Sequence, residues 1–138
     1  SLPTCGDLET EWLPVLTTGA GTAKGWISLP DVEDRVVAMF PRGEPGIGFV
    51  IGGLYPDGPP DSGIEGGRVR RCSLLTPGGQ KLMFDDLSRS IRMQDEGGSY
   101  VELAPEKLTI HASGDLELDA SGHTITVRGS LVNFERGS

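Results

Sequence analysis

The last third of the chain alternates apolar and polar residues in short segments of nearly constant length. From Ser90 onward, each segment of about eight residues places two apolar residues at positions i and i+2, with Gly or a small polar residue near its end. This alternation predicts β-strands with one buried face, and its repetition is typical of stacked units. The apolar pairs are Ile91 and Met93, Val101 and Leu103, Leu108 and Ile110, Leu116 and Leu118, Ile125 and Val127, and Val132 and Phe134.

The first 55 residues show a different pattern, in which apolar clusters of four to seven residues are separated by Gly, Pro and Asp. Such clusters are typical of the strands of a small barrel or sandwich, and none has the spacing of an amphipathic helix. Pro14 predicts an edge strand or a bend, because proline cannot donate to a strand ladder. The clusters cover residues 12–16, 26–29, 36–40 and 49–55.

The segment between these two patterns, PDGPPDSGIEGG at residues 56–67, is rich in Pro and Gly and has almost nothing to bury. Such a composition favours a linker. We therefore expect a first domain over residues 1–58, a linker over 59–67, and a second domain over 68–138 with regular repeats from about residue 90. Strands at 69–75 and 81–84 should form a hairpin around Pro77-Gly78-Gly79.

One copy of the C-terminal repeats has too few inward side chains to enclose a core. Three chains around a common axis would bring their apolar rows together and cover their strand edges. The pattern therefore predicts a trimeric needle, about 30 Å long for six strand layers. Its core would contain Ile91, Met93, Val101, Leu103, Leu108, Ile110, Leu116, Leu118, Ile125 and Val127.

The composition favours an all-β fold and opposes nucleic-acid binding. Twenty-one Gly and ten Pro indicate many turns and few long helices. Twenty acidic residues against twelve basic ones give a net charge of −8, which disfavours contact with a phosphate backbone. We expect neither a transmembrane helix nor a signal peptide, because no long apolar run or signal pattern occurs. Cys5 and Cys72 could pair or remain free thiols, and free thiols are favoured.

Several stretches resemble one protein family, in the family's own order. WLPVL (12–16), GWISLPDVEDRVVAMF (25–40) and GFVIGGLYPDGPP (48–60) resemble the OB-fold part of the phage baseplate assembly protein V and VgrG spike family. RRCSLLTPGGQKLMFDD (70–86) resembles the segment that leads into this family's trimeric β-helix. The resemblance covers nearly the entire chain. It implies an all-β fold, with a small OB-fold barrel followed by a triple-stranded, intertwined β-helix needle.

The same resemblance implies a function. It indicates a homotrimeric central spike of a contractile-tail baseplate, from a phage, a tailocin or a related injection system. Such a spike is assembled in the bacterial cytoplasm, contacts the baseplate hub protein and helps to pierce the target cell envelope. Two features depart from the family: residues matching LPTCGDL usually follow a helical stretch and an opening OB strand, and the H-x-H iron motif of some spike tips is missing.

The final repeat remains apolar to its end, which would leave three copies of its side chains exposed at the blunt tip of a trimer. The resemblance suggests that a separate cone-shaped protein of the PAAR type covers this tip and supplies any metal. The expected docking platform consists of Leu131, Val132, Asn133, Phe134, Glu135 and Arg136.

Other chemical signals favour ordinary structural roles. His111 and His123 could bind metal about a threefold axis, but alternation turns His111 away from the apolar face and His123 follows a Gly turn. The Asp residues lie mostly where turns are expected, and the Gly-rich loops lack a phosphate-binding pattern. We therefore expect no active site, cofactor or metal. Aromatic residues of an OB fold can stack on bases, yet the charge favours barrel core or hub contact for Trp12, Leu13 and Trp26.

An alternative interpretation is a small acidic β-solenoid that acts as a binding or adhesin module. An enzyme would have to use the Asp residues as glycosidase carboxylates. Oligomeric state separates the first two possibilities, because the spike has to be a trimer.

Overall fold

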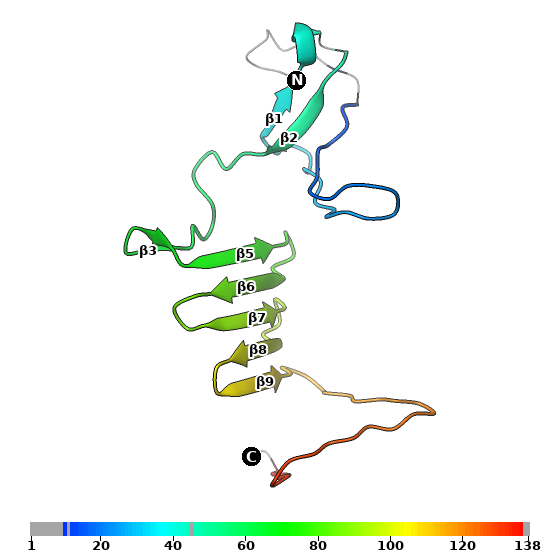
Figure 1. Ribbon diagram of the computed structural model, residues 1–138, viewed down its shortest axis with the longest axis vertical. Coiled ribbons are helices and arrows are strands. Elements are labelled where there is room, and N and C mark those ends of the chain that lie inside the picture. The colour runs from blue at the N-terminus through cyan, green and yellow to red at the C-terminus, as the bar shows by residue number, and fades with distance from the viewer. Residues whose placement is uncertain (1–9, 11, 45, 137–138) are drawn as a thin grey trace. The chain divides into compact units, whose positions relative to one another are not determined.

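The computed structural model describes residues 10, 12–44 and 46–136, which form β-strands, turns and one 3-10 turn (Figure 1). No α-helix occurs in these ranges, so the prediction of an all-β fold is confirmed. Accordingly, no helix in them is long and apolar enough to cross a membrane.

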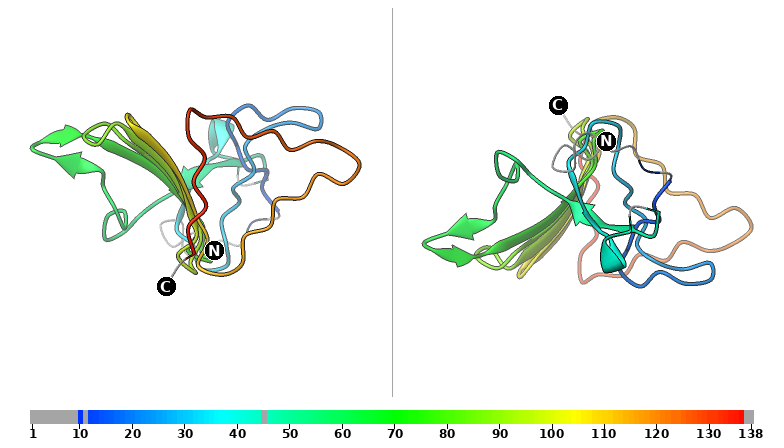
Figure 2. Two further views of the ribbon diagram at one scale, coloured as in Figure 1. Left: turned by 90° about the horizontal axis from the view of Figure 1, so that it is seen from below. Right: turned by 90° about the horizontal axis from the view of Figure 1, so that it is seen from above.

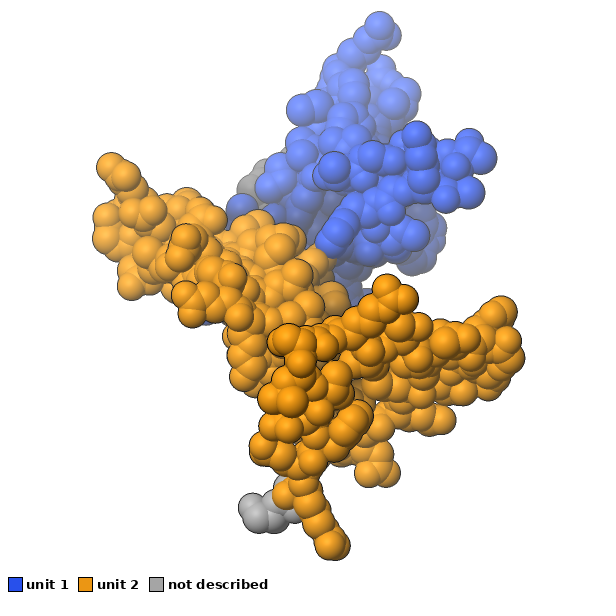
Figure 3. Space-filling model, turned by 60° about the horizontal axis from the view of Figure 1, so that its bottom comes forward, with its two compact units in different colours: residues 1–60 blue, residues 61–138 orange. Residues whose placement is uncertain are grey.

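The chain divides into two compact units, residues 1–60 and 61–138 (Figure 3). The division falls inside the Pro- and Gly-rich segment. Residues 61–67, which were expected in the linker 59–67, belong to the second unit.

In the first unit, β1 (Val36–Met39) and β2 (Phe49–Gly53) form an antiparallel pair, joined through the 3-10 turn η2 (Pro41–Gly43). The N–H of Leu16 donates to the carbonyl of Val50 at 2.8 Å, and the N–H of Val50 donates to the carbonyl of Pro14 at 2.9 Å. Residues 14–16 therefore lie along β2 on the side opposite β1. This outer position suits Pro14, which has no N–H to contribute.

Only two of the four apolar clusters expected as strands are strands. Residues 12–16 contribute a single bridge to β2, and residues 26–29 form none. Those residues find little to pack against, and Ile27 is 86% exposed. Val50 is the one buried hydrophobic residue among the described residues. The described part of this unit therefore contains two paired strands and one bridge, and no closed barrel.

The second unit contains a short hairpin, β3 (Ile64–Glu65) and β4 (Arg68–Val69), and a five-stranded antiparallel sheet. The sheet is a meander, because each strand pairs with the next one along the chain (Figure 1). In Figure 2 its strands lie one behind another. Its strands are β5 (Arg71–Leu75), β6 (Lys81–Asp85), β7 (Ser90–Gln94), β8 (Tyr100–Ala104) and β9 (Lys107–His111).

The hairpin expected around Pro77-Gly78-Gly79 is confirmed. It joins β5 to β6, and the N–H of Gly79 donates to the carbonyl of Thr76 at 3.0 Å. The N–H of Thr76 donates in turn to the carbonyl of Gln80 at 3.0 Å, which closes the turn.

The strands of this sheet differ from the expected needle in two ways. Regular pairing begins at Arg71 and not near residue 90, and all five strands pair within one chain. Residues 71–111 therefore form an ordinary antiparallel sheet within one chain, in which no strand is exchanged with another chain. Short turns explain the difference, because they place each strand next to its predecessor before any second chain is needed.

The segment after β9 has no assigned strand between residues 112 and 136. It leaves the end of β9, reverses direction and returns (Figure 1). The reversal lies at residues 120–123, where the N–H of His123 donates to the carbonyl of Ala120 at 2.8 Å. Three of the six predicted strand segments therefore have no strand partner in the single chain.

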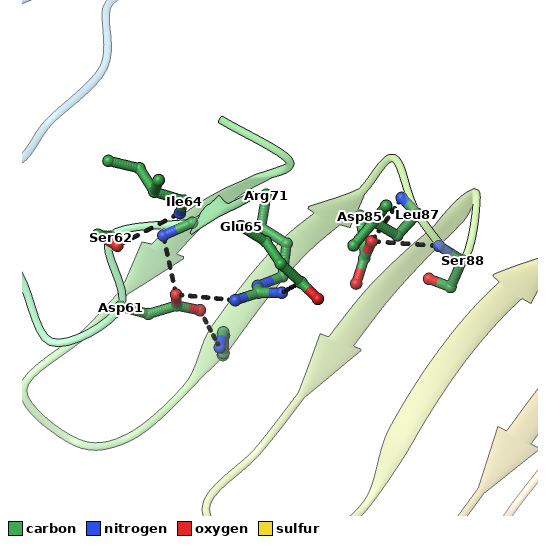
Figure 4. Close-up of polar contacts among 10 residues, drawn as sticks. Asp61, Ser62, Ile64, Glu65, Arg71, Asp85, Leu87 and Ser88 are labelled. Atoms are coloured by element: carbon green, nitrogen blue, oxygen red, sulfur yellow. Dashed lines mark hydrogen bonds and ion pairs between the residues drawn. The ribbon is translucent and has the colours of Figure 1, made fainter. Parts of the chain in front are cut away.

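A polar cluster holds the hairpin β3–β4 against the start of the sheet (Figure 4). Asp61 accepts from the N–H of Gly63 at 2.9 Å and lies 3.5 Å from Arg71 and 3.6 Å from Lys81. The Gly63 N–H and the Arg71 guanidinium lower the pKa of Asp61 below its usual value, and Asp61 in turn raises the pKa of Arg71. Glu65 also pairs with Arg71, at 3.1 Å.

Gly63 is the residue that this junction requires. Its carbonyl accepts from the N–H groups of Arg70 and Arg71 at 2.7 and 3.1 Å. Its φ is +67°, and a Cβ atom there would lie 2.1 Å from the carbonyl oxygen of Arg71. Only glycine meets both conditions without moving the chain.

Candidate interaction surface

The five-stranded sheet has one face made entirely of apolar residues and Cys72. Residues paired directly across an antiparallel ladder share a face, as do residues two apart along a strand. The register therefore gives two parallel rows across all five strands. One row is Cys72, Phe84, Ile91, Leu103 and Leu108, and the other is Leu74, Leu82, Met93, Val101 and Ile110.

Most of this apolar face is open to solvent, and among the described residues only the start of the segment after β9, around Leu116, lies over one end of it. Met93, Leu108 and Ile110 are each more than half exposed. The chain exposes 12108 Å² in total. A compact monomer of this mass would expose about 6900 Å², and two separate compact domains of half the mass about 8300 Å². Part of this excess comes from the loosely packed first unit and from the segment 112–136, and part from the open sheet face.

The sequence identified part of this surface. Ile91, Met93, Val101, Leu103, Leu108 and Ile110, all expected in a trimer core, lie together on the apolar face. The other four expected core residues lie in the unpaired segment, where they are exposed: Leu116, Leu118, Ile125 and Val127.

Four residues of the apolar face were not predicted: Cys72, Leu74, Leu82 and Phe84. Their signal was present in the same alternation, which runs through RRCSLL and KLMF. The predicted apolar rows start only at Ile91, because the regular repeats were expected from about residue 90.

A groove of about 600 Å³ lies over one end of the apolar face. Its apolar lining comes from the row of Leu74, Leu82, Met93, Val101 and Ile110, joined by Leu116. Polar side chains from the turns border it, among them Gln80, Asp95 and Asp115. Its apolar floor suits another apolar side chain better than a polar ligand.

The opposite face of the sheet is mostly polar, although Leu75, Met83 and Ala104 also lie on it, and several of its side chains interact with one another. Arg92 and Glu102 are paired across β7 and β8, and their side chains form an ion pair at 3.1 Å. The Arg92 guanidinium carbon lies 3.8 Å from the centre of the Tyr100 ring. His111 stacks on the same ring with a centroid separation of 5.1 Å. These contacts are typical of a solvated face.

The position of His111 confirms that it points away from the apolar face, because it pairs with Tyr100 while its neighbour Ile110 pairs with Val101. No group of three or more His, Cys, Asp or Glu side chains is placed to hold a metal ion within the described ranges. Cys72 is a free, exposed thiol, whereas Cys5 lies outside the described residues.

Carboxylates in the second unit serve turns, as expected. Asp85 accepts from the N–H groups of Leu87 and Ser88 at 2.8 and 3.2 Å (Figure 4). Asp95 accepts from the N–H of Ser99 at 2.7 Å. These bonds fix the turn after β6 and the turn after β7, which lie at opposite ends of the strands.

In the first unit, the single chain does not bury the tryptophans that were expected in the barrel core or at the hub. Trp12 is fully exposed, Trp26 is 53% exposed, and Leu13 is half-buried. Trp12 is therefore not in a core formed by this chain, and its contact with another chain stays a proposal.

The expected docking platform for a tip protein lies at the end of the described chain. All six of its residues are exposed, with Phe134 at 93% and Leu131 at 78%. The side chains of Asn133 and Glu135 are 3.5 Å apart. Docking at this platform stays a prediction.

Comparison with known proteins gives one family. Residues 1–55 match the family described as the type VI secretion system/phage-baseplate injector OB domain. The match covers the first unit except its last five residues. No curated protein matches the chain with significance.

Proposed function

We propose that this chain is the homotrimeric central spike of a phage baseplate or a type VI injector. The match of residues 1–55 to the injector OB-domain family of such particles supports this proposal. This match supports a structural role related to the baseplate, and a place in a virion or an injection particle. The proposal adds the trimer, the needle, the piercing of a target envelope and assembly in the bacterial cytoplasm.

The observation that carries the proposal is the open apolar face of β5–β9. Ten residues form it, in two rows that run the length of the sheet. Soluble monomers seldom expose an apolar patch of this extent. Three copies with these faces turned inward would cover one another, and the polar faces with Arg92 and Glu102 would remain in water.

The width of the sheet suits three copies. Strands of five residues are about 17 Å long, and the centre of an equilateral triangle of that side lies about 5 Å from each side. This is half of the roughly 10 Å that separates packed sheets. Four copies would leave a hollow centre, because each sheet would stand about 8.5 Å from the axis. Two sheets packed face to face would also satisfy the spacing of about 10 Å. The choice of three copies therefore rests on the resemblance to trimeric spikes.

The unpaired segment 112–136 adds support for strands exchanged between chains. Its pairs Leu116 and Leu118, and Ile125 and Val127, keep the alternation of the sheet yet remain exposed. An unpaired strand of this kind finds backbone partners when neighbouring chains lie beside it. We assign the intertwined part of the needle to this segment.

Two contacts complete the proposal. Trp12, Leu13 and Trp26 face the baseplate hub protein or a neighbouring chain, and Leu131–Arg136 receives a PAAR-type tip protein. Nucleic acid has no part in it, since the net charge is −8.

Light scattering on the purified protein tests the central statement. We expect a mass three times the 14.6 kDa of one chain, and resistance of the trimer to SDS, because local opening must separate three chains. A monomer, or a dimer that persists at high concentration, would overturn the proposal. Co-purification with a candidate tip protein, with and without residues 131–136, tests the docking platform separately.

A further inference from the structure

We infer that the turns at one end of the sheet of each copy interlock with the turns at the other end of the sheet of the next copy, held by Arg89 and Lys107 against Asp95, Glu96 and Asp115. This inference rests on the proposed trimer and specifies how its three sheets are joined at their corners.

The meander gives the sheet two different ends. End A carries the turns 86–89 and 105–106 and the first residue of β9, Lys107. End B carries the turns 76–80 and 95–99 and the residues 112–115 that follow β9. Consecutive strands run in opposite directions, so the turns alternate between the two ends.

Threefold symmetry then determines which ends meet. With the apolar faces inward and the strands stacked along the axis, the three sheets form the sides of a triangular prism. A closed ring with a threefold axis joins unlike surfaces, so end A of each copy meets end B of the next at every corner. Contact of end A with end A is excluded.

The levels of the turns along the axis favour interlocking. The turn 86–89 lies between β6 and β7, whereas the nearest turns of end B lie between β5 and β6 and between β7 and β8. The two sets are therefore offset by one strand spacing, about 4.8 Å. At a corner, the turn 86–89 of one copy enters the gap between the turns 76–80 and 95–99 of its neighbour.

The charges at the two ends are complementary at these levels. End B carries the carboxylates Asp95, Glu96 and Asp115, and no lysine or arginine in its turns. Lys81, at the start of β6, is already paired with Asp61. Arg89 lies at the same height along the axis as Asp95, since the two residues flank β7, and Lys107 lies near the height of Asp115, since Lys107 begins β9 and Asp115 follows it. In the described part of the chain, none of these five residues takes part in an ion pair.

End A also carries the acidic residues Asp85, Asp86 and Glu106 and, beside β5, the residues 63–70 with Arg70 next to Asp86. The attraction proposed here comes from Arg89 and Lys107. The apolar Leu87 lies in the same turn as Arg89, is 52% exposed, and has its N–H held by Asp85. The groove beside Leu82, Met93 and Val101 opens at end B of the neighbouring copy. Leu87 is therefore the apolar side chain that end A brings to the corner.

A pair of cysteines tests the inference directly. The variant Arg89→Cys/Asp95→Cys is made in a background where Cys5 and Cys72 are replaced by Ala, and this background must first show the trimeric mass by light scattering. Positions 89 and 95 flank β7 and are about 20 Å apart in one chain. A disulfide requires Cα atoms within about 7 Å, so any disulfide has to join two chains. We expect oxidation to give covalent trimers in non-reducing SDS gels.

The matched control is Arg89→Cys/Lys107→Cys, with both positions at end A. Within one chain β8 separates them by two strand spacings, about 10 Å, and the symmetry never brings two A ends together. This control should stay uncrosslinked. A trimeric protein in which Arg89→Cys/Asp95→Cys gives no covalent trimer, or in which the control crosslinks equally, overturns the inference and leaves the proposed trimer intact.

If the protein without Cys5 and Cys72 does not form a trimer, charge-reversal variants test the same inference. Arg89→Glu should raise the concentration at which half of the trimer dissociates by about threefold to tenfold, and adding Asp95→Arg should restore most of the loss. If the loss of trimer stability in the double variant equals the sum of the losses in Arg89→Glu and Asp95→Arg, the pairing is overturned. A wild-type protein that is monomeric would overturn the proposed function and this inference together.

Discussion

The sheet β5–β9 and the segment 112–136 have the same alternation of apolar and polar residues, but only the sheet pairs with itself. In the sheet, opposite strands bring favourable polar partners together, such as Arg92 with Glu102 and Tyr100 with His111. In the segment after β9, Asp115, Glu117 and Asp119 occupy successive positions of one face. Alternation therefore predicts which residues form a strand, whereas the choice of partner depends on the side chains across the ladder.

Val101→Asp should have the largest effect on trimer stability, because it changes the apolar face of the sheet β5–β9. Val101 lies in the middle of the apolar face on β8. In a trimer, three carboxylates would meet near the axis without partners, at a cost of about 3–5 kcal/mol per copy. We expect loss of the trimer in light scattering. The control is Ser73→Asp, at an exposed position on the other face of β5 opposite Met83, which should retain the trimeric mass. Equal loss in both variants would contradict the assignment of faces.

Leu118→Asp addresses the unpaired segment and should cost about 2–4 kcal/mol, because it places a charge where the neighbouring chains would bury Leu118. Unlike Val101→Asp, it should leave the sheet β5–β9 protected from hydrogen exchange while residues 112–136 lose protection. Glu117→Lys, on the other face of the same segment, should be mild. An SDS-resistant Leu118→Asp trimer would show that Leu118 faces solvent.

Gly63→Ala should destabilise the start of the sheet by about 1–3 kcal/mol, since it combines a positive φ with a contact that would be far too short. Thermal unfolding measures the loss. Gly66→Ala is the control: its φ is +59°, but nothing lies within 4 Å of the added Cβ. It therefore separates backbone strain from steric overlap, and a loss no larger at Gly63 than at Gly66 would contradict the close approach to Arg71.

Asp61→Asn should have the smallest effect and a defined dependence on pH. The pKa of Asp61 in the folded protein lies below its usual value, because the carboxylate accepts from the Gly63 N–H and pairs with Arg71. The ionised carboxylate therefore stabilises the fold at pH values above the pKa that Asp61 has in the unfolded chain. This stabilisation is lost as the pH falls through the lower, native pKa. The difference in melting temperature between wild type and Asp61→Asn should therefore be small at pH 7 and vanish at strongly acidic pH. A difference that grows on acidification would contradict the lowered pKa.

Much of the second unit could be predicted from the sequence because its strands are local. The turn TPGGQ and the pairs from Ile91 to Ile110 specify both the strands and their common face. The hairpin of β5 and β6 follows from its turn, whereas its pairing with β7 into one continuous sheet was not predicted, because the regular repeat was taken to begin only near residue 90. In the first unit, the cluster 26–29 has the composition of a strand but no partner among the described residues. Composition gives the propensity of a strand, and pairing also requires a neighbour.

The pairing of each strand with the next one along the chain also has a kinetic consequence. Contacts between residues near in sequence form quickly, because little loop entropy is lost in closing them. The sheet β5–β9 should consequently form within each newly made chain, before any encounter with a second copy. Association is then a second-order step, and its rate rises with the concentration of chains. Until it occurs, each chain presents a complete apolar face to the surrounding solution, where it can also join unrelated partners. Dilution during refolding should therefore favour soluble but unassembled chains, and high concentration should favour both assembly and aggregation.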